Sequence, residues 1–230
     1  MTTFVPNQEF TQLASEEQLT KTVQALETNG IRTVIFQTGE EARAYVLDLI
    51  PSGVEVYDSP SRTLELIGLA ENIEHATQFR SVRARLHSLD RTTQRREIRS
   101  LTASPDVLVG SVHAITEQGE VLLASATGSQ LGPAAAGAGI VIWVVGTQKL
   151  VHTLEDGFRR IQEYSLPLES ERTQRVYGHE KCSPPGYATP QSAHTIARRE
   201  PLPADVCYNL SPWTTFRSFL FYAPGREVDG

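Results

Sequence analysis

Residues 106–150 read DVLVGSVHAITEQGEVLLASATGSQLGPAAAGAGIVIWVVGTQKL and decide the fold of the chain. The stretch has few charged side chains and three short apolar runs, Val107–Val109, Val121–Ala124 and Ile140–Val145. Short apolar runs bounded by Gly or Ser are typical of buried strands rather than helices. Between the second and third run lies SATGSQ, residues 125–130, a loop of small and mostly polar side chains. Buried strands that end in such loops build ligand sites in α/β sheets, so the stretch predicts a small-molecule site.

The segment before this stretch alternates between helix and strand signals. SEEQ at residues 15–18 and TGEE at residues 38–41 are capping-box patterns, and each opens a predicted helix. Two short segments, Ile31–Phe36 and Val54–Tyr57, follow these helices and predict strands. The helix–strand–helix–strand order indicates a mostly parallel sheet with crossover helices, and therefore an α/β fold.

Composition and charge exclude several classes of protein. The formal net charge of -6 argues against general binding to nucleic acid or to anionic membranes. No apolar run is long enough to span a bilayer. The N-terminus lacks the features of a secretory signal or a transit peptide, which predicts a cytoplasmic location. Cys182 and Cys207 form no C-x-x-C pair, so we expect no zinc or iron–sulfur cofactor in this chain.

The chain divides into three predicted parts: an N-terminal arm at residues 1–14, an α/β domain at 15–170, and a Pro-rich tail at 171–230. In the tail, Pro residues interrupt every periodic run, and only Val206–Leu210 and Phe216–Tyr222 resemble strands. We expect residues 171–200 to lack much regular structure.

A loop after the Val54–Tyr57 run predicts an anion site. It reads DSPSRT and leads into an apolar helical pattern, so free backbone N–H groups and the charge of Arg62 can face an anion. Ser61 is the second predicted contact in this loop. The alternative is that Ser59 or Ser61 only caps the helix.

The segment Arg80–Arg99 carries seven arginines against Asp90 and Glu97. Its apolar residues keep helical spacing, which predicts one amphipathic helix with a basic, solvated face. A subunit contact, or an arginine supplied to an anionic ligand, are further interpretations. Nucleic acid is disfavoured because no aromatic residues are interleaved.

Seven further residues are candidate binding or catalytic residues. Glu117 precedes a glycine turn and can act as a base or a nucleophile, or it is a hairpin residue that faces water. His113 can shuttle a proton, or it is a hydrogen-bonded core side chain. The loop Thr127, Gly128, Ser129 and Gln130 can wrap an anion, or it is a plain connection. Lys149 can neutralise a carboxylate or phosphate, or it is a surface lysine.

Several pieces of the chain together resemble one family. They are SRTLELIGL at 61–69, GSVHAITE at 110–117 with GSQL at 128–131, and VVGTQKLV at 144–151. This pattern resembles the LUD-domain family of the lactate-utilisation LutC/YkgG type, over residues 15–178. The resemblance implies a three-layer α/β fold similar to the NagB/RpiA/CoA-transferase group. It also implies a link to oxidation of lactate or a related small acid, with iron–sulfur clusters in separate partner subunits.

The leading hypothesis is therefore a LUD-domain protein that binds a small organic anion and takes part in 2-hydroxy acid utilisation. The first alternative is an enzyme that transforms an acyl-CoA or a sugar phosphate with Glu117. The second is a non-catalytic accessory subunit of an iron–sulfur oxidoreductase, bound through the basic Arg80–Arg99 segment. A second copy of the chain is a further candidate partner.

Overall fold

The computed structural model describes residues 5–125, 128–177, 194–197 and 216–222 of the chain. The chain forms two compact units, and each is built from three separate segments. The four-strand unit contains Met1–Ala25, Val112–Thr127 and Gln148–Arg198, and the six-strand unit contains Leu26–Ser111, Gly128–Thr147 and Arg199–Gly230.

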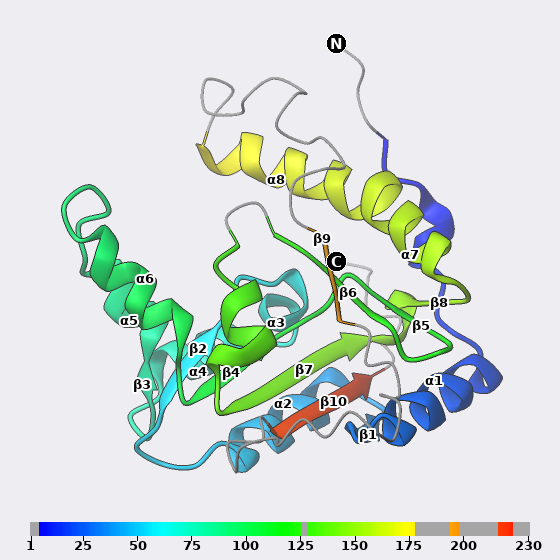
Figure 1. Cartoon of the computed structure of the whole chain (residues 1–230), viewed down its shortest axis with the longest axis horizontal. Helices are drawn as coiled ribbons and strands as arrows, with labels where there is room; N and C mark the ends of the chain where they lie inside the picture. The colour runs from blue at the N-terminus through cyan, green and yellow to red at the C-terminus, as the bar shows by residue number, and fades with distance from the viewer. Residues whose placement is uncertain (1–4, 126–127, 178–193, 198–215, 223–230) are drawn as a thin grey trace, which may run out of the picture. The chain divides into compact units, whose positions relative to one another are not determined.

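The six-strand unit is built on a parallel sheet with the order β1-β10-β7-β4-β2-β3 (Figure 1). Every neighbouring pair in this sheet is parallel. The sheet therefore confirms the α/β class with a mostly parallel sheet. Its strands are β1 (Arg32–Phe36), β2 (Glu55–Asp58), β3 (Arg80–Ser81), β4 (Val107–Gly110), β7 (Ile140–Gly146) and β10 (Phe216–Tyr222).

Strand β10 lies between β1 and β7, although it comes from far along the chain. Leu220 is in register with Val34 of β1 on one side and with Val144 of β7 on the other. The expectation of a strand at Phe216–Tyr222 is thus confirmed, and the tail supplies an inner strand of the sheet. The second strand predicted in the tail, Val206–Leu210, lies outside the described residues.

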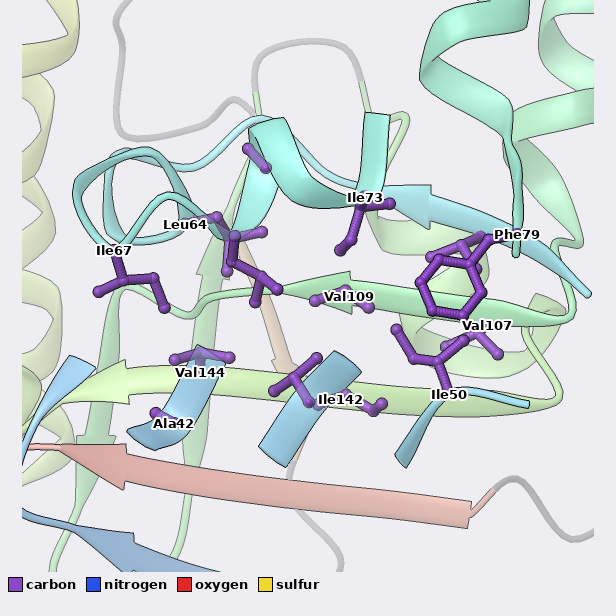
Figure 2. Close-up of a cluster of buried hydrophobic side chains, with 14 residues drawn as sticks. Ala42, Ile50, Leu64, Ile67, Ile73, Phe79, Val107, Val109, Ile142 and Val144 are labelled. Atoms are coloured by element: carbon purple, nitrogen blue, oxygen red, sulfur yellow. The ribbon is translucent and has the colours of Figure 1, made fainter. Parts of the chain in front are cut away.

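One face of this sheet is covered by α2 (Gly39–Leu49), α3 (Arg62–Leu66) and α4 (Leu69–His75). Figure 2 shows side chains of these helices, such as Leu64 and Ile73, packed over the strands. The strand residues in this core alternate, because every second side chain of a strand points to the same face. They are Val56, Val107, Val109, Ile142 and Val144. The opposite face is also buried at Tyr57, Leu108 and Trp143, as the continuous apolar runs predict.

The basic segment does not form the single helix that the sequence predicts. It contains β3, then α5 (Val82–His87), a turn, and α6 (Arg95–Ala103). The break occurs because the carboxylate of Asp90 accepts hydrogen bonds from the Thr92 N–H at 2.7 Å and from the Thr92 hydroxyl. Such local side-chain bonds compete with helical hydrogen bonds and favour a turn.

The four-strand unit holds a smaller sheet with the order β8-β5-β6-β9. Its strands are β5 (Ala114–Thr116), β6 (Val121–Ala124), β8 (Leu150–Val151) and β9 (His194–Ala197). Strands β5 and β6 form the expected hairpin, and Gly119 takes a φ of 80° in its turn. The remaining helical segments of the chain are η1 (Gln8–Thr11), α1 (Glu16–Thr28), η2 (Pro133–Gly137), η3 (Thr147–Lys149), α7 (Leu154–Arg160), η4 (Ile161–Ser165) and α8 (Leu166–Tyr177).

The expectation of irregular structure at residues 171–200 is wrong in two places. Helix α8 continues to Tyr177, and residues 194–197 form β9, which pairs with β6. Helix α8 follows directly on α7 and η4, so Pro167 lies within a continuous helical run, just after the π-helical turn Ile161–Ser165. Two ion pairs at helical spacing support it, Glu169–Arg172 and Glu171–Arg175.

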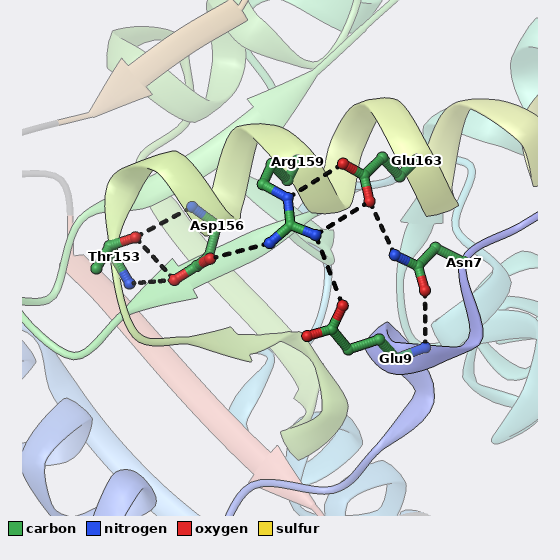
Figure 3. A network of polar contacts seen from close by, with 6 residues as sticks. All are labelled: Asn7, Glu9, Thr153, Asp156, Arg159 and Glu163. Atoms are coloured by element: carbon green, nitrogen blue, oxygen red, sulfur yellow. Dashed lines mark hydrogen bonds and ion pairs between the residues drawn. The ribbon is translucent and has the colours of Figure 1, made fainter.

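The N-terminal arm is held on the four-strand unit by a polar network (Figure 3). Asn7 Nδ2 donates to Glu163 Oε2 at 2.8 Å, and Arg159 Nη2 lies 3.6 Å from Glu9 Oε2. The Arg159 guanidinium also stacks over the Phe10 ring at 5.7 Å. The arm is thus part of the packed structure from η1 onward. In the described part of the chain, no helix is both long and apolar enough to span a membrane.

Gly110→Ala tests the packing at the end of β4. A Cβ at Gly110 would lie 2.5 Å from Ser59 Oγ and 2.6 Å from Trp143 Cζ3, so we expect a loss of about 1–3 kcal/mol from overpacking. Urea unfolding measures this loss. Gly132→Ala is the control, because its Cβ would meet no atom within 4 Å. Equal stability of the two variants would contradict the prediction.

Candidate functional site

A buried ion pair marks the carboxyl end of β2. The side chain of Asp58 is fully buried, and its Oδ2 accepts a hydrogen bond from Arg83 Nη1 at 2.7 Å. Arg83 comes from α5 and is 23% exposed, so its guanidinium reaches the surface of the six-strand unit. It forms no other hydrogen bond with a described residue. A guanidinium has five N–H donors, and Asp58 Oδ2 accepts from one of its nitrogens.

Two buried polar atoms of the neighbouring residues Asp58 and Ser59 have no hydrogen-bond partner among the described residues. They are Asp58 Oδ1 and the hydroxyl oxygen of Ser59. Burial raises the pKa of Asp58, and the hydrogen bond and charge of Arg83 oppose the rise. An unpaired buried polar group costs about 1–3 kcal/mol, so such a pair of atoms favours a ligand that offers both a donor and an acceptor.

Gly110 leaves space for the Ser59 hydroxyl. The backbone of Ser59 is fixed by its N–H, which donates to Val109 O at 2.9 Å across the β2–β4 ladder. Any side chain at Gly110 would collide with Ser59 Oγ. The glycine therefore keeps the hydroxyl in place at the carboxyl edge, where ligands bind in parallel α/β sheets.

Three of the predicted site residues gather at this edge. Ser61 is the N-cap residue of α3 and makes no side-chain capping bond, and Arg62 follows it with 74% of its side chain exposed. Arg62 Nη1 lies 3.4 Å from Glu65 Oε2, and the charge of Glu65 also acts on Arg83. Burial raises the pKa of Tyr57, and a hydrogen bond from Ser129 opposes the rise. Ser129 is thus in contact with β2.

The other residues of the predicted Thr127–Gln130 loop are Thr127, Gly128 and Gln130. Gly128, with a φ of 73°, and Gln130 flank Ser129 in the six-strand unit. Thr127 lies outside the described residues. The sequence placed Asp58 and Ser59 in the predicted anion loop but indicated neither as a binding residue, and it did not single out Arg83. The signal available for Asp58 was an acidic residue directly after the predicted strand Val54–Tyr57.

Glu117 belongs to the four-strand unit, where it links the β5–β6 hairpin to α1 and to the segment Val151–His152. Its Oε1 is 2.7 Å from His152 Nδ1, and its Oε2 is 4.0 Å from Lys21 Nζ. Its N–H donates to Val151 O at 3.1 Å. The carboxylate is 16% exposed and is engaged by two basic side chains. This geometry explains a structural role, and a catalytic role of Glu117 stays a prediction.

His113 is part of the same unit and is bound to its sheet. Its Nδ1 accepts a hydrogen bond from the Ala124 N–H at 3.2 Å, and its N–H donates to Leu122 O. The accepting Nδ1 requires the proton of a neutral ring to be on Nε2. His113 is therefore fixed against β6 by its backbone and side chain, and its proposed proton transfer is untested.

Lys149 lies beside a buried guanidinium. Arg160 is 3% exposed and donates to the carbonyl oxygens of Gln148 and His113 and to the Ser165 hydroxyl. Burial lowers the pKa of Lys149 from its ordinary 10.5 to about 7, and the charge of Arg160 adds to this effect. Lys149 therefore changes its charge near neutral pH. Among the described residues, no cluster of three or more His, Cys, Asp or Glu side chains is placed to hold a metal ion.

The fold and this edge define an α/β protein with a polar cluster at the carboxyl ends of parallel strands. A family model for the LUD domain matches residues 19–178. The chain therefore belongs to the LUD-domain family, which confirms the resemblance seen in the sequence. Among proteins with curated descriptions, none matches the chain.

Two solved structures are similar to this chain at low identity. The crystal structure of a DUF162 family protein from Deinococcus radiodurans has a TM-score of 0.49 and 10% identity, and the match covers 93% of this chain and 100% of that chain. Ribose 5-phosphate isomerase from Plasmodium falciparum has a TM-score of 0.32 and 12% identity, with 63% of this chain and 67% of that chain covered.

Arg83→Met tests the buried ion pair. The change leaves the Asp58 carboxylate buried without its partner, so we expect a loss of about 3 kcal/mol in the free energy of unfolding. Arg85→Met on the same helix removes an exposed pair with Glu97 and should cost less than about 1 kcal/mol. Unfolding in guanidinium chloride measures the free energy of unfolding of the two variants. The double variant Asp58→Asn/Arg83→Met should recover part of the loss, and equal losses in the two single variants would refute the buried pair.

Lys149→Met tests the lowered pKa of that lysine. The folded state binds fewer protons than the unfolded state between about pH 7 and 10.5, so the stability of the natural chain rises with pH in this range. The stability of the variant relative to the natural chain should therefore fall between pH 6 and pH 9, as measured by thermal unfolding. Lys21→Met should show no such change, because the pKa of Lys21 is raised by Glu17. If the stability difference between Lys149→Met and the natural chain did not change with pH, the lowered pKa would be contradicted.

Proposed function

We propose that this LUD-domain protein binds a small 2-hydroxy acid anion at the carboxyl edge of its six-stranded sheet, and that it takes part in lactate-type utilisation. Membership of the family supports the metabolic role. The observation that carries the proposal is the pair of unpartnered buried atoms, Asp58 Oδ1 and Ser59 Oγ, next to arginines that reach the surface.

The chemistry of this edge matches the two functional groups of a 2-hydroxy acid. Its carboxylate is a planar, charged acceptor, and a guanidinium binds such a group through paired N–H donors. Arg83 and Arg62 supply these donors. The hydroxyl group of the ligand donates one hydrogen bond and accepts another. It can satisfy either Asp58 Oδ1, by donating to it, or the Ser59 hydroxyl, by accepting from it.

The arrangement also explains why the site needs Gly110 and a fixed β2–β4 register. The Ser59 hydroxyl and the Asp58 carboxylate are set by strand pairing, since Asp58 is in register with Val109. Sites on strands hold their groups more rigidly than sites on loops, which lowers the entropy cost of binding. Ser61 and Ser129 would then contact the ligand from the loops around this edge.

Titration calorimetry with L-lactate and with propionate tests the proposal. Propionate lacks the hydroxyl group, so we expect the natural chain to bind lactate more tightly, and Ser59→Ala to reduce that preference. Arg62→Ala should weaken lactate binding about tenfold, because it removes hydrogen bonds to a charged group. Arg80→Ala is the matched control, since Arg80 is 66% exposed and lies 3.8 Å from Asp106, and it should bind lactate normally. Absence of lactate binding by the natural chain, or equal binding by Arg62→Ala, would overturn the proposal.

An enzyme that transforms an acyl-CoA or a sugar phosphate with Glu117 stays the alternative. It requires Glu117→Gln to abolish turnover while binding is retained. A role of Lys149 in anion binding stays a prediction of the sequence, and Lys149→Ala tests it by the same calorimetry.

A further inference from the structure

Helices α5 and α6 form a helical hairpin that presents arginines on its surface. This arginine hairpin comprises residues 82–103, and Figure 1 shows its connecting loop directed away from the strands of the six-strand unit. The loop is ordered by hydrogen bonds, because Thr92 donates to Asp90 Oδ1 and the Asp90 N–H donates to Gln94 Oε1 at 2.8 Å. The hairpin is thus a defined structure rather than a charged coil.

Four arginines of this hairpin are exposed and unpaired. They form no ion pair and no side-chain hydrogen bond with any residue in the described part of the chain: Arg91, Arg95, Arg96 and Arg99. Asp90 is engaged by Thr92, and Glu97 is paired with Arg85 at 2.9 Å. Both acidic side chains of the hairpin are therefore already bonded to other residues of the hairpin.

This cluster of like charges is unfavourable for the isolated molecule. Arg95 and Arg99 are four residues apart on α6, and like charges at this spacing destabilise a helix by about 0.2–0.5 kcal/mol. By contrast, the surface arginines of α8 are matched to acids, as in Glu169–Arg172 and Glu171–Arg175. The chain has a net charge of -6, so acidic residues are abundant, yet none of the described ones forms an ion pair with these four arginines.

We propose that the arginine hairpin is a docking surface for an acidic patch on another protein. Its arginines would each pair with a carboxylate of the partner, which relieves their mutual repulsion and sets the orientation of the complex. The partner is defined by this chemistry alone, and the inference is independent of the 2-hydroxy acid site.

Nucleic acid fits this surface less well than an acidic protein does. Between Arg80 and Ala103 the chain has no Phe, Tyr or Trp that can stack on bases. A duplex carries about one charge per 1.7 Å of its axis, so a chain with a net charge of -6 meets strong long-range repulsion there. A few carboxylates on a folded partner impose a smaller repulsion on the rest of the chain.

Fluorescence anisotropy of the full chain with two labelled probes tests the docking surface. The probes are a glutamate-rich peptide and a duplex DNA of similar length, both at low salt. We expect the peptide to bind more tightly than the duplex, and Arg95→Gln/Arg99→Gln to weaken peptide binding about fivefold, as the loss of two exposed ion pairs predicts. Arg172→Gln/Arg175→Gln is the matched control and should bind the peptide normally.

Thermal unfolding checks that the variants are folded, and Arg95→Gln/Arg99→Gln should melt no lower than the natural chain because it removes a repulsion. Three results would overturn the proposal. They are absence of peptide binding by the natural chain, tighter binding of the duplex than of the peptide, and equal weakening in the two double variants.

Discussion

The six-strand unit depends on the parallel pairing of β10 with both β1 and β7. These two strands do not pair with each other, so β10 satisfies the facing row of backbone hydrogen-bonding groups on each of them. Buried backbone groups need such partners. The pairing of β7 with β4, and of β4 with β2, continues the same sheet and brings Asp58, Ser59 and Gly110 to one edge. The chemistry proposed for this edge thus rests on a strand that comes from the distant C-terminal part of the chain.

The central strands of the large sheet were predictable because they are buried on both faces and are therefore apolar along their whole length. Val107–Val109 and Ile140–Val145 show this pattern, and they form β4 and β7. The break between α5 and α6 was not predicted, because apolar residues keep helical spacing through it while the Asp90–Thr92 bonds favour a turn. Strand β9 was missed for another reason. Its partner β6 is remote in sequence, and strand formation there depends on pairing rather than on local propensity.

The candidate site was predictable in part. Ser61, Arg62 and Ser129 were indicated by polar loops that follow apolar strands, and the structure places them at the carboxyl edge of β2. Asp58 and Arg83 were missed because their ion pair joins residues 25 positions apart, on a strand and on a helix. Sequence spacing does not reveal such a contact. The unpartnered state of Asp58 Oδ1 is likewise a property of packing, and only coordinates report it.

The interleaving of the two units limits how the chain can be divided. Each unit draws on three separate segments, and the polypeptide passes back and forth between them. Neither unit can be excised as one contiguous fragment, and a truncation in the middle of the gene removes parts of both. Recombination at a single point would also fail to exchange either unit between relatives. The carboxyl edge at Asp58 and the hairpin at Glu117 are therefore inherited together, even though each has its own sheet.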